Sequence, residues 1–125
     1  AAPIFDLVVL HAPVACLALG SRDHLGDGAV DTFMGGRPED VPERYAVTDP
    51  AALLPDPDAR RVLLHGDADV EVPLAQSEAY LAHLRAHGMP AELTVMPGDG
   101  HYEILDPSSP VSQMRRDLLA RTLLR

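Results

Sequence analysis

The segment Arg61–Pro73 constrains this chain more than any other, because it passes directly from an apolar run into a turn rich in acids. Residues 62–64 are uniformly apolar and too short for an amphipathic helix, which predicts a central parallel strand covered on both faces. Gly66 follows, and we expect it to allow a sharp backbone turn where a side chain would obstruct it. Asp69 is then placed at the carboxyl end of the strand, where open α/β sheets hold their ligands. Pro73 suits the first position of a following helix.

Charge and cysteine content narrow the classes of partner. The chain has 125 residues, enough for one domain with a core. Its formal charge of -9, from 19 acids and 10 bases that are all arginine, argues against nucleic acid or an anionic membrane as a partner. A single cysteine, Cys16, excludes an internal disulfide and is typical of a reducing compartment, so we expect a cytoplasmic location. No apolar run approaches the roughly 20 residues of a membrane span.

The hydrophobic pattern predicts strands and helices in alternation. Residues 17–58 are rich in glycine and proline and too long for a bare loop, so we expect a lid-like excursion with short helices near 27–34 and 38–45. The order predicts an α/β fold of about three parallel strands flanked by helices, with right-handed crossovers. Outside the central segment and the excursion, the expected elements are strands at 5–10 and 91–96 and helices at 74–87 and from Pro110 onward.

Two predicted loops leave the carboxyl ends of neighbouring strands. One carries Asp69 and the other carries His101 after the turn Gly98–Gly100. In a parallel sheet both loops lie at the same edge, so we expect the carboxylate and the imidazole to meet. A carboxylate that accepts from an imidazole fixes its tautomer and stabilises its cation, as a histidine general base requires.

These residues resemble a known family. The pattern His-Gly-x-x-Asp-x-x-Val-Pro over residues 65–73, followed by Gly-Asp-Gly-His over 98–101, is similar to the C-terminal half of α/β-hydrolases, in the esterase, lipase and prolyl-oligopeptidase-like branch. The resemblance covers residues 1–125. It implies a partial α/β-hydrolase fold and serine-type hydrolysis of a small-molecule ester or amide, including a peptide bond. In it Asp69 is the triad acid and His101 the triad base.

The nucleophile departs from that family pattern. No glycine in the chain is followed two residues later by serine, so there is no G-x-S-x-G elbow, and an HGGG-type oxyanion loop is also missing. We therefore expect negligible hydrolysis by this chain alone. Three explanations stay open: a fragment of a longer enzyme, one chain of a two-chain hydrolase, or a non-catalytic binding domain. In the first two, the edge of the strand at Phe5–Leu10 is left unpaired, which favours association with a missing N-terminal half or with another copy.

The other candidate residues have simpler interpretations. We expect no cofactor and no metal, since His83 and His87 lie four apart on a helix with no evident third ligand, and a solvated face is the better interpretation. His65 is expected to pack or hydrogen-bond behind the site. Cys16 lacks the flanking glycines of an elbow and is expected to be a small buried side chain. The serines at 108, 109 and 112 are expected to cap the last helix.

Overall fold

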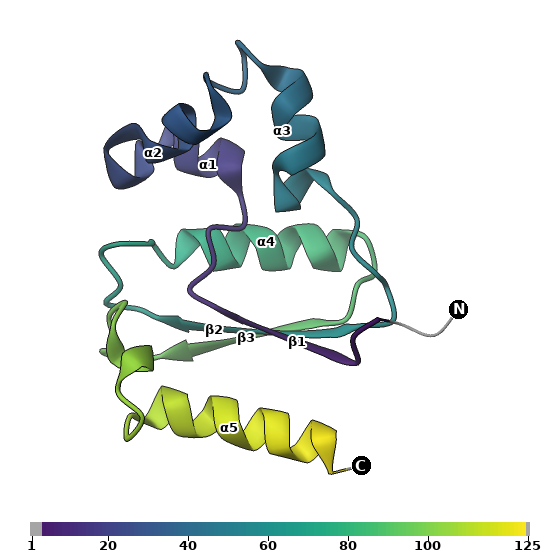
Figure 1. The fold of residues 1–125 in the computed structure, drawn as a ribbon, viewed down its shortest axis with the longest axis vertical. Coiled ribbons are helices and arrows are strands. Elements are labelled where there is room, and N and C mark those ends of the chain that lie inside the picture. Colours follow the sequence, from purple (N-terminus) through teal and green to yellow (C-terminus); the bar gives the residue numbers. More distant parts are fainter. Residues whose placement is uncertain (1–3, 125) are drawn as a thin grey trace.

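The apolar run predicted as the central strand forms β2 (Arg60–Gly66), which pairs in parallel with β1 (Leu7–His11) on one side and β3 (Ala91–Met96) on the other. The structure, a computed structural model, describes residues 4–124. Helix α4 (Ala75–Ala86) covers one face of the sheet and α5 (Pro110–Leu123) the other (Figure 1). The predicted class, three parallel strands flanked by helices, is confirmed.

Successive side chains of β2 point to opposite faces, and each face has its own apolar cluster. Leu63 packs with Tyr80 and Leu84 of α4. Val62 and Leu64 pack on the other face with Val111, Met114 and Leu118 of α5. Both leucines are fully buried, which contributes about 2 kcal/mol each to folding. The sequence of β2 is continuously apolar over residues 62–64 because both faces of the strand are buried there.

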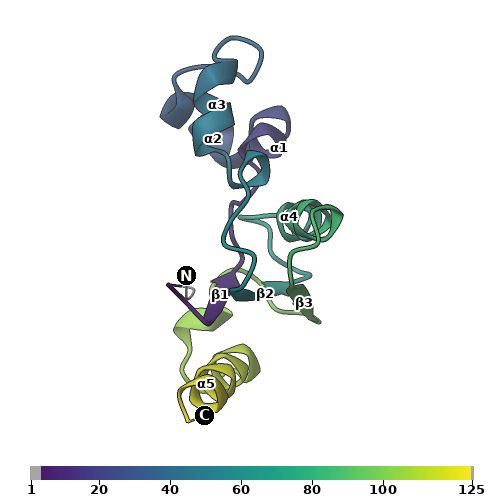
Figure 2. The ribbon, with the colours of Figure 1, turned by 90° about the vertical axis from the view of Figure 1, so that its right-hand side faces the viewer.

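The excursion, residues 17–58, contains α1 (Leu17–Arg22), α2 (Leu25–Met34), α3 (Pro42–Thr48) and the 3-10 turn η1 (Pro50–Ala52). These helices lie beyond α4, on the side of α4 away from the sheet (Figure 2). They share a separate apolar cluster of Leu17, Val30, Met34 and Tyr45. The helical character of the excursion is confirmed, whereas its action as a lid stays a prediction.

Several boundaries differ from the predicted ones. The first strand begins two residues late, because pairing starts at Leu7 opposite Arg60 and Phe5 is left 64% exposed. Helix α1 was not predicted. Residues 26–28 have positive φ, so regular helix in α2 starts only after them. The helix predicted at 38–45 instead begins at Pro42, because the Arg37 carbonyl accepts the N–H groups of residues 40 and 41 in a preceding turn.

The later elements follow the sequence pattern more closely. Helix α4 begins two residues after Pro73, whose carbonyl accepts the N–H of Gln76. The predicted third strand matches β3. Ser109 caps α5 by accepting from the Ser112 N–H, as expected. The 3-10 turn η2 (Glu103–Leu105) was not predicted. Within residues 4–124, no helix is both long and apolar enough to span a bilayer.

Candidate active site

Two loops meet at the carboxyl ends of the strands: the acid loop, residues 67–74, after β2, and the histidine loop, residues 97–102, after β3. The Asp67 carboxylate accepts the Gly98 N–H at 2.7 Å. The Ala68 N–H donates to the Asp99 carbonyl at 3.0 Å. Parallel pairing of β2 with β3 ends both strands at the same edge, and these bonds then join the two loops. The spatial arrangement expected from the sequence is present.

Gly66 allows this close approach because it has no side chain. Its φ is not among the positive values found in the described residues. Instead, a Cβ at this position would lie 2.0 Å from the Asp99 carbonyl oxygen. Glycine is required here because the backbone of the histidine loop occupies the space that a side chain would need. The expectation that a side chain at this position would obstruct the backbone is therefore confirmed, and the obstructing group is the Asp99 carbonyl.

Asp69 is held on both carboxylate oxygens. Oδ1 accepts the N–H groups of Glu71 at 3.0 Å and Val72 at 2.8 Å, while Oδ2 accepts from His101 Nδ1 at 2.8 Å. Its side chain has no exposed surface. Burial acts to raise the pKa of the Asp69 carboxyl, but the N–H of Val72 and the His101 ring outweigh it and lower that pKa below its usual value. Asp69 is therefore an ionised acceptor at neutral pH.

His101 is oriented by this contact. Because an ionised carboxylate can only accept, His101 Nδ1 carries a proton, and in the neutral ring Nε2 is the basic nitrogen. The side chain is 32% exposed, so the ring reaches the surface while its Nδ1 end is fixed. Tyr102 packs edge-on, with ring centroids 5.3 Å apart. A group placed against Nε2 could lose a proton to it.

Two further histidines lie at the same ends of the strands. His65 is fully buried and hydrogen-bonded, as expected. His11, the last residue of β1, was not singled out from the sequence, because a lone histidine at a strand end has no motif around it. Burial lowers the pKa of His11, and the positive charge of Arg115 lowers it further, while the Asp69 carboxylate acts in the opposite direction. Among the described residues, no hydrogen-bond partner is found for its Nδ1.

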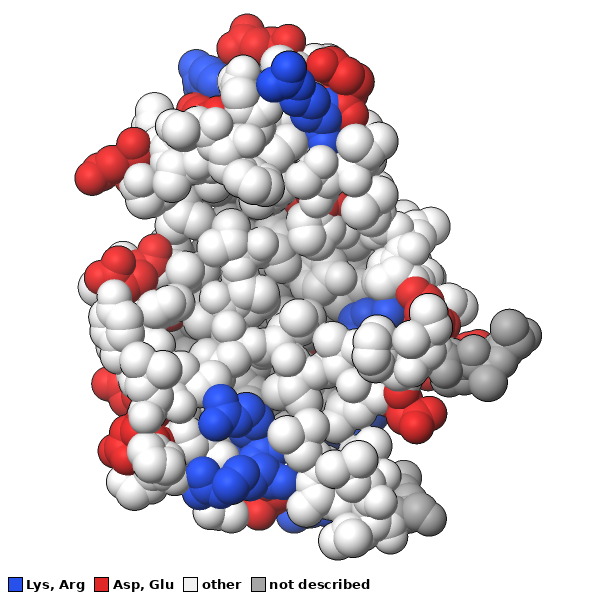
Figure 3. Space-filling model, in the orientation of Figure 1, with Lys and Arg blue, Asp and Glu red and all other residues white. Residues whose placement is uncertain are grey.

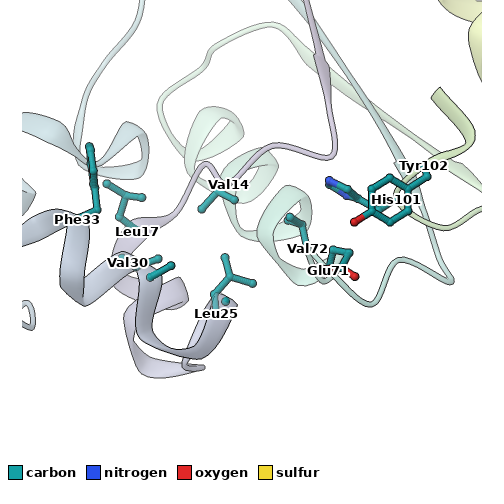
Figure 4. Close-up of a pocket in the computed structure, with 11 residues that line it drawn as sticks. Val14, Leu17, Leu25, Val30, Phe33, Glu71, Val72, His101 and Tyr102 are labelled. Carbon is teal, nitrogen blue, oxygen red and sulfur yellow. The ribbon is translucent and has the colours of Figure 1, made fainter. Parts of the chain in front are cut away.

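A cavity of about 500 Å³ adjoins His101, between the excursion and the two loops. Figure 4 shows its walls: His101, Tyr102, Glu71 and Val72 on one side and apolar side chains, most of them from the excursion, opposite. Glu71 is the one acidic side chain, and His101 the one basic side chain, among the lining residues described. The remaining lining residues are Val14, Leu17, Leu25, Gly26, Ala29, Val30 and Phe33. The cavity therefore suits an apolar group placed next to the Nε2 side of the pair.

The remaining candidates lie outside this site. His83 is half-buried on α4, where its Nε2 donates to the Leu53 carbonyl, and His87 is exposed just after the helix ends. Across residues 4–124, no cluster of three or more histidine, cysteine or acidic side chains could hold a metal ion. Cys16 is half-buried at the start of α1, and burial raises the pKa of its thiol. Its backbone N–H donates to Gln76 Oε1 at 2.9 Å.

Solved structures with this fold include both peptidases and esterases. An acylaminoacyl peptidase in complex with Z-Gly-Gly-Phe-chloromethyl ketone superposes with a TM-score of 0.70 at 20% identity, covering 99% of this chain and 20% of that chain. Thermogutta terrifontis esterase 2 gives 0.65 at 21% identity over 95% and 40%. An acetyl ester-xyloside bifunctional hydrolase from Caldicellulosiruptor lactoaceticus gives 0.63 at 24% identity over 86% and 38%. These identities show the fold alone, and the chain spans less than half the length of each.

The sequence itself carries the family assignment. No curated protein matches the chain significantly. The profile of the prolyl oligopeptidase family, in contrast, matches residues 1–120, nearly the whole sequence. The fold, the strand order and the motif around residues 65–73 agree with that match. The chain belongs to the prolyl oligopeptidase family.

Proposed function

We propose that this chain supplies the acid and the base of a serine hydrolase triad, with Asp69 orienting His101 for proton transfer during hydrolysis of an ester or amide bond. The observation that carries the proposal is the 2.8 Å bond from His101 Nδ1 to a buried, ionised Asp69. His101 Nε2 would take the proton of an attacking hydroxyl, and Asp69 would stabilise the imidazolium that forms.

The attacking serine would come from a separate segment docked against β1. One side of β1 pairs with β2, and the other side is an edge of the sheet. Figure 3 looks onto this side of the molecule and shows a centre nearly free of charged residues, with most acids and arginines at its margin. The solved relatives are at least twice as long as the part this chain covers, which supports a strand-bearing hydrolase half as the occupant.

The substrate would place an apolar group in the 500 Å³ cavity beside His101. The aliphatic walls contributed by the excursion favour an acyl or side-chain group of that character. The Glu71 carboxylate at the same site would repel an anionic substrate group and attract a cationic one. Both effects would be weak, because Glu71 is exposed to solvent.

The test is reconstitution of the triad. The chain is joined in frame behind a segment of a solved acylaminoacyl peptidase that supplies a strand and a G-x-S-x-G turn, and the fusion is assayed with p-nitrophenyl esters. We expect hydrolysis by the fusion, none by the bare chain, and loss of activity in His101→Ala. His87→Ala, which removes an exposed histidine, is the matched control and should retain activity.

The other outcomes are equally informative. Hydrolysis by the bare chain that disappears with His101→Ala would reveal a nucleophile within these 125 residues and overturn the proposed division of the triad. A folded fusion that binds apolar esters in the cavity without cleaving them would favour the alternative, a non-catalytic binding domain. A stable dimer of the bare chain, detected by sedimentation, would favour a second copy in place of a missing half as the partner of the β1 edge.

A further inference from the structure

His65 contacts the acid loop and α4 at the same time. It lies in β2, its ring is fully buried, and it belongs to the motif that precedes Asp69 without being part of the acid and base pair. Nε2 lies 2.8 Å from the Val72 carbonyl oxygen in the acid loop. Nδ1 lies 2.7 Å from the Ser77 hydroxyl in α4. One ring thus connects the strand, the acid loop and the helix that follows it.

The partners determine where its proton lies. A carbonyl oxygen can only accept a hydrogen bond, so His65 Nε2 must carry a proton and donate it to Val72. In the neutral ring Nδ1 is then an acceptor, which the Ser77 hydroxyl fills as donor. Both nitrogens are satisfied without a net charge. Because a buried imidazolium would cost far more than this neutral arrangement, the site favours one tautomer of an uncharged ring.

Val72, whose carbonyl accepts from His65, also hydrogen-bonds to Asp69. The Val72 N–H donates to Asp69 Oδ1 at 2.8 Å, so fixing the Val72 carbonyl restricts the same residue from its other side. His65 Nε2 also lies 3.5 Å from Asp69 Oδ2, the oxygen that accepts from His101. The Asp69 carboxylate therefore lies near the His65 ring nitrogen in addition to the two backbone N–H groups and His101.

We propose that His65, held by Ser77, is a positioning residue for the Asp69 and His101 pair. It acts as a neutral N–H donor that holds the acid loop so that Oδ2 stays within hydrogen-bonding distance of His101. It touches neither the cavity nor a reacting group. The inference rests on the proposed role of the pair, but its consequence is a property of His101 in this chain and is measurable without turnover.

Two substitutions separate the two ends of the ring. The amide nitrogen of glutamine can take the place of Nε2, so His65→Gln keeps a donor toward Val72. Asparagine reaches only the Nδ1 position, so His65→Asn keeps the contact with Ser77 and loses the donor. Ser77→Ala removes the hydroxyl and leaves the ring in place. His24→Asn is the matched control, because His24 is exposed and has the left-handed φ that asparagine tolerates.

The measurement is ¹⁵N NMR of the ring nitrogens and their bound protons in the 125-residue chain. In the wild type we expect the His65 proton on Nε2, and we expect the hydrogen bond to Asp69 to protect the His101 Nδ1 proton from exchange with water. In His65→Asn the Asp69 contact loosens, so the His101 Nδ1 proton should exchange about threefold or more faster, toward its rate in Asp69→Asn. His65→Gln should restore much of the protection, Ser77→Ala should give a smaller increase in rate, and His24→Asn should match the wild type.

Other results would overturn the inference. These are a His65 ring protonated on Nδ1 alone, or an exchange rate of the His101 Nδ1 proton that is unchanged or slower in His65→Asn. If His65→Asn does not fold, Ser77→Ala decides, since an unchanged exchange rate in that variant would contradict the proposal. If the NMR changes occur as expected but the fusion is inactive, only the proposed hydrolase function is contradicted. If the fusion is active and the variants leave the NMR signals of His101 unchanged, only the role of His65 is contradicted.

Discussion

The two loops at the ends of β2 and β3 and the helical excursion form their distant contacts in different ways. The loops directly follow paired strands, so the register of the sheet brings Gly66 against the Asp99 backbone and Asp67 against Gly98. The excursion contains no strand, and its distant contacts depend on single polar side chains. Asp49 accepts the N–H groups of Leu17 and Ala18, 32 and 31 residues before it, and so caps α1 from a distance.

A second distant contact attaches the excursion to the rest of the molecule. Gln76 of α4 accepts the Cys16 N–H through Oε1 and donates to the Cys16 carbonyl through Nε2. The excursion is thus attached by polar side chains to the layer below it, in addition to its own apolar cluster. We therefore expect the contact between Asp69 and His101 to survive substitutions that unfold part of the excursion. The cavity should not survive them, because it lies between the excursion and the two loops.

The largest expected effect comes from Asp69→Asn at the loops. In the active fusion we expect kcat to fall by about four orders of magnitude, because the amide cannot hold the His101 tautomer that exposes a basic Nε2. Asp58→Asn, at an exposed aspartate of the excursion, should leave kcat unchanged. Steady-state kinetics on a p-nitrophenyl ester makes the comparison. A loss smaller than tenfold would mean that Asp69 is not the acid.

Gly66→Ala tests the close approach of the two loops. The added Cβ would lie 2.0 Å from the Asp99 carbonyl oxygen, so the histidine loop must move. We expect the free energy of unfolding to fall by about 3 kcal/mol in urea titrations. Gly88→Ala, at a glycine with open space and positive φ, provides a backbone-strain comparison and should cost about 1 kcal/mol. Equal losses would show that the contact with Asp99 is not limiting.

Asp49→Ala tests the distant cap of the excursion. It removes the acceptor for the N–H groups of Leu17 and Ala18 and for that of Ala51, and should destabilise by about 2 kcal/mol. Hydrogen exchange should lose protection in α1 while the His101 NMR signals stay in place. Changes at His101 as large as those in α1 would contradict the separation of the two regions.

Glu71→Gln sharpens the role of the cavity. Its carboxylate is exposed, so its removal should lower the preference of the fusion for a cationic over a neutral apolar ester by about threefold to fivefold. The ratio of the two kcat/KM values measures that preference. Glu78→Gln, on α4 and outside the cavity lining, is the control and should leave the ratio unchanged.

Acid titration should give the smallest effect. The folded-state pKa of Asp69 is lower than the usual 3.8, so its ionised form adds stability above that value, and this contribution is lost as the pH falls through the folded-state pKa. We expect the wild type to lose its stability advantage over Asp69→Asn between about pH 5 and pH 2. Urea unfolding at several pH values checks this. A constant difference would mean that the pKa of Asp69 is not lowered.

Much of the sheet and of its edge could be predicted from the sequence. The apolar run of β2, the period of α4 and the alternation of β3 each report burial that is local and repeated, so their class and order were correct. The same pattern brought Asp69 and His101 to one end of the sheet, because parallel strands leave no other place for loops that follow them. The lack of a G-x-S-x-G turn was also readable without coordinates.

The tertiary structure alone decided the rest. No residue near Leu17 in the sequence predicts the start of α1, because the side chain that caps this helix is the distant Asp49. The start of α3 is set by the preceding turn at Arg37. The bond from Ser77 to His65 and the place of His11 at the same edge depend on which helix face and strand end meet in space. Local pattern determines which segments are buried, whereas polar contacts between distant residues form only once those segments have packed, and no sequence period records them.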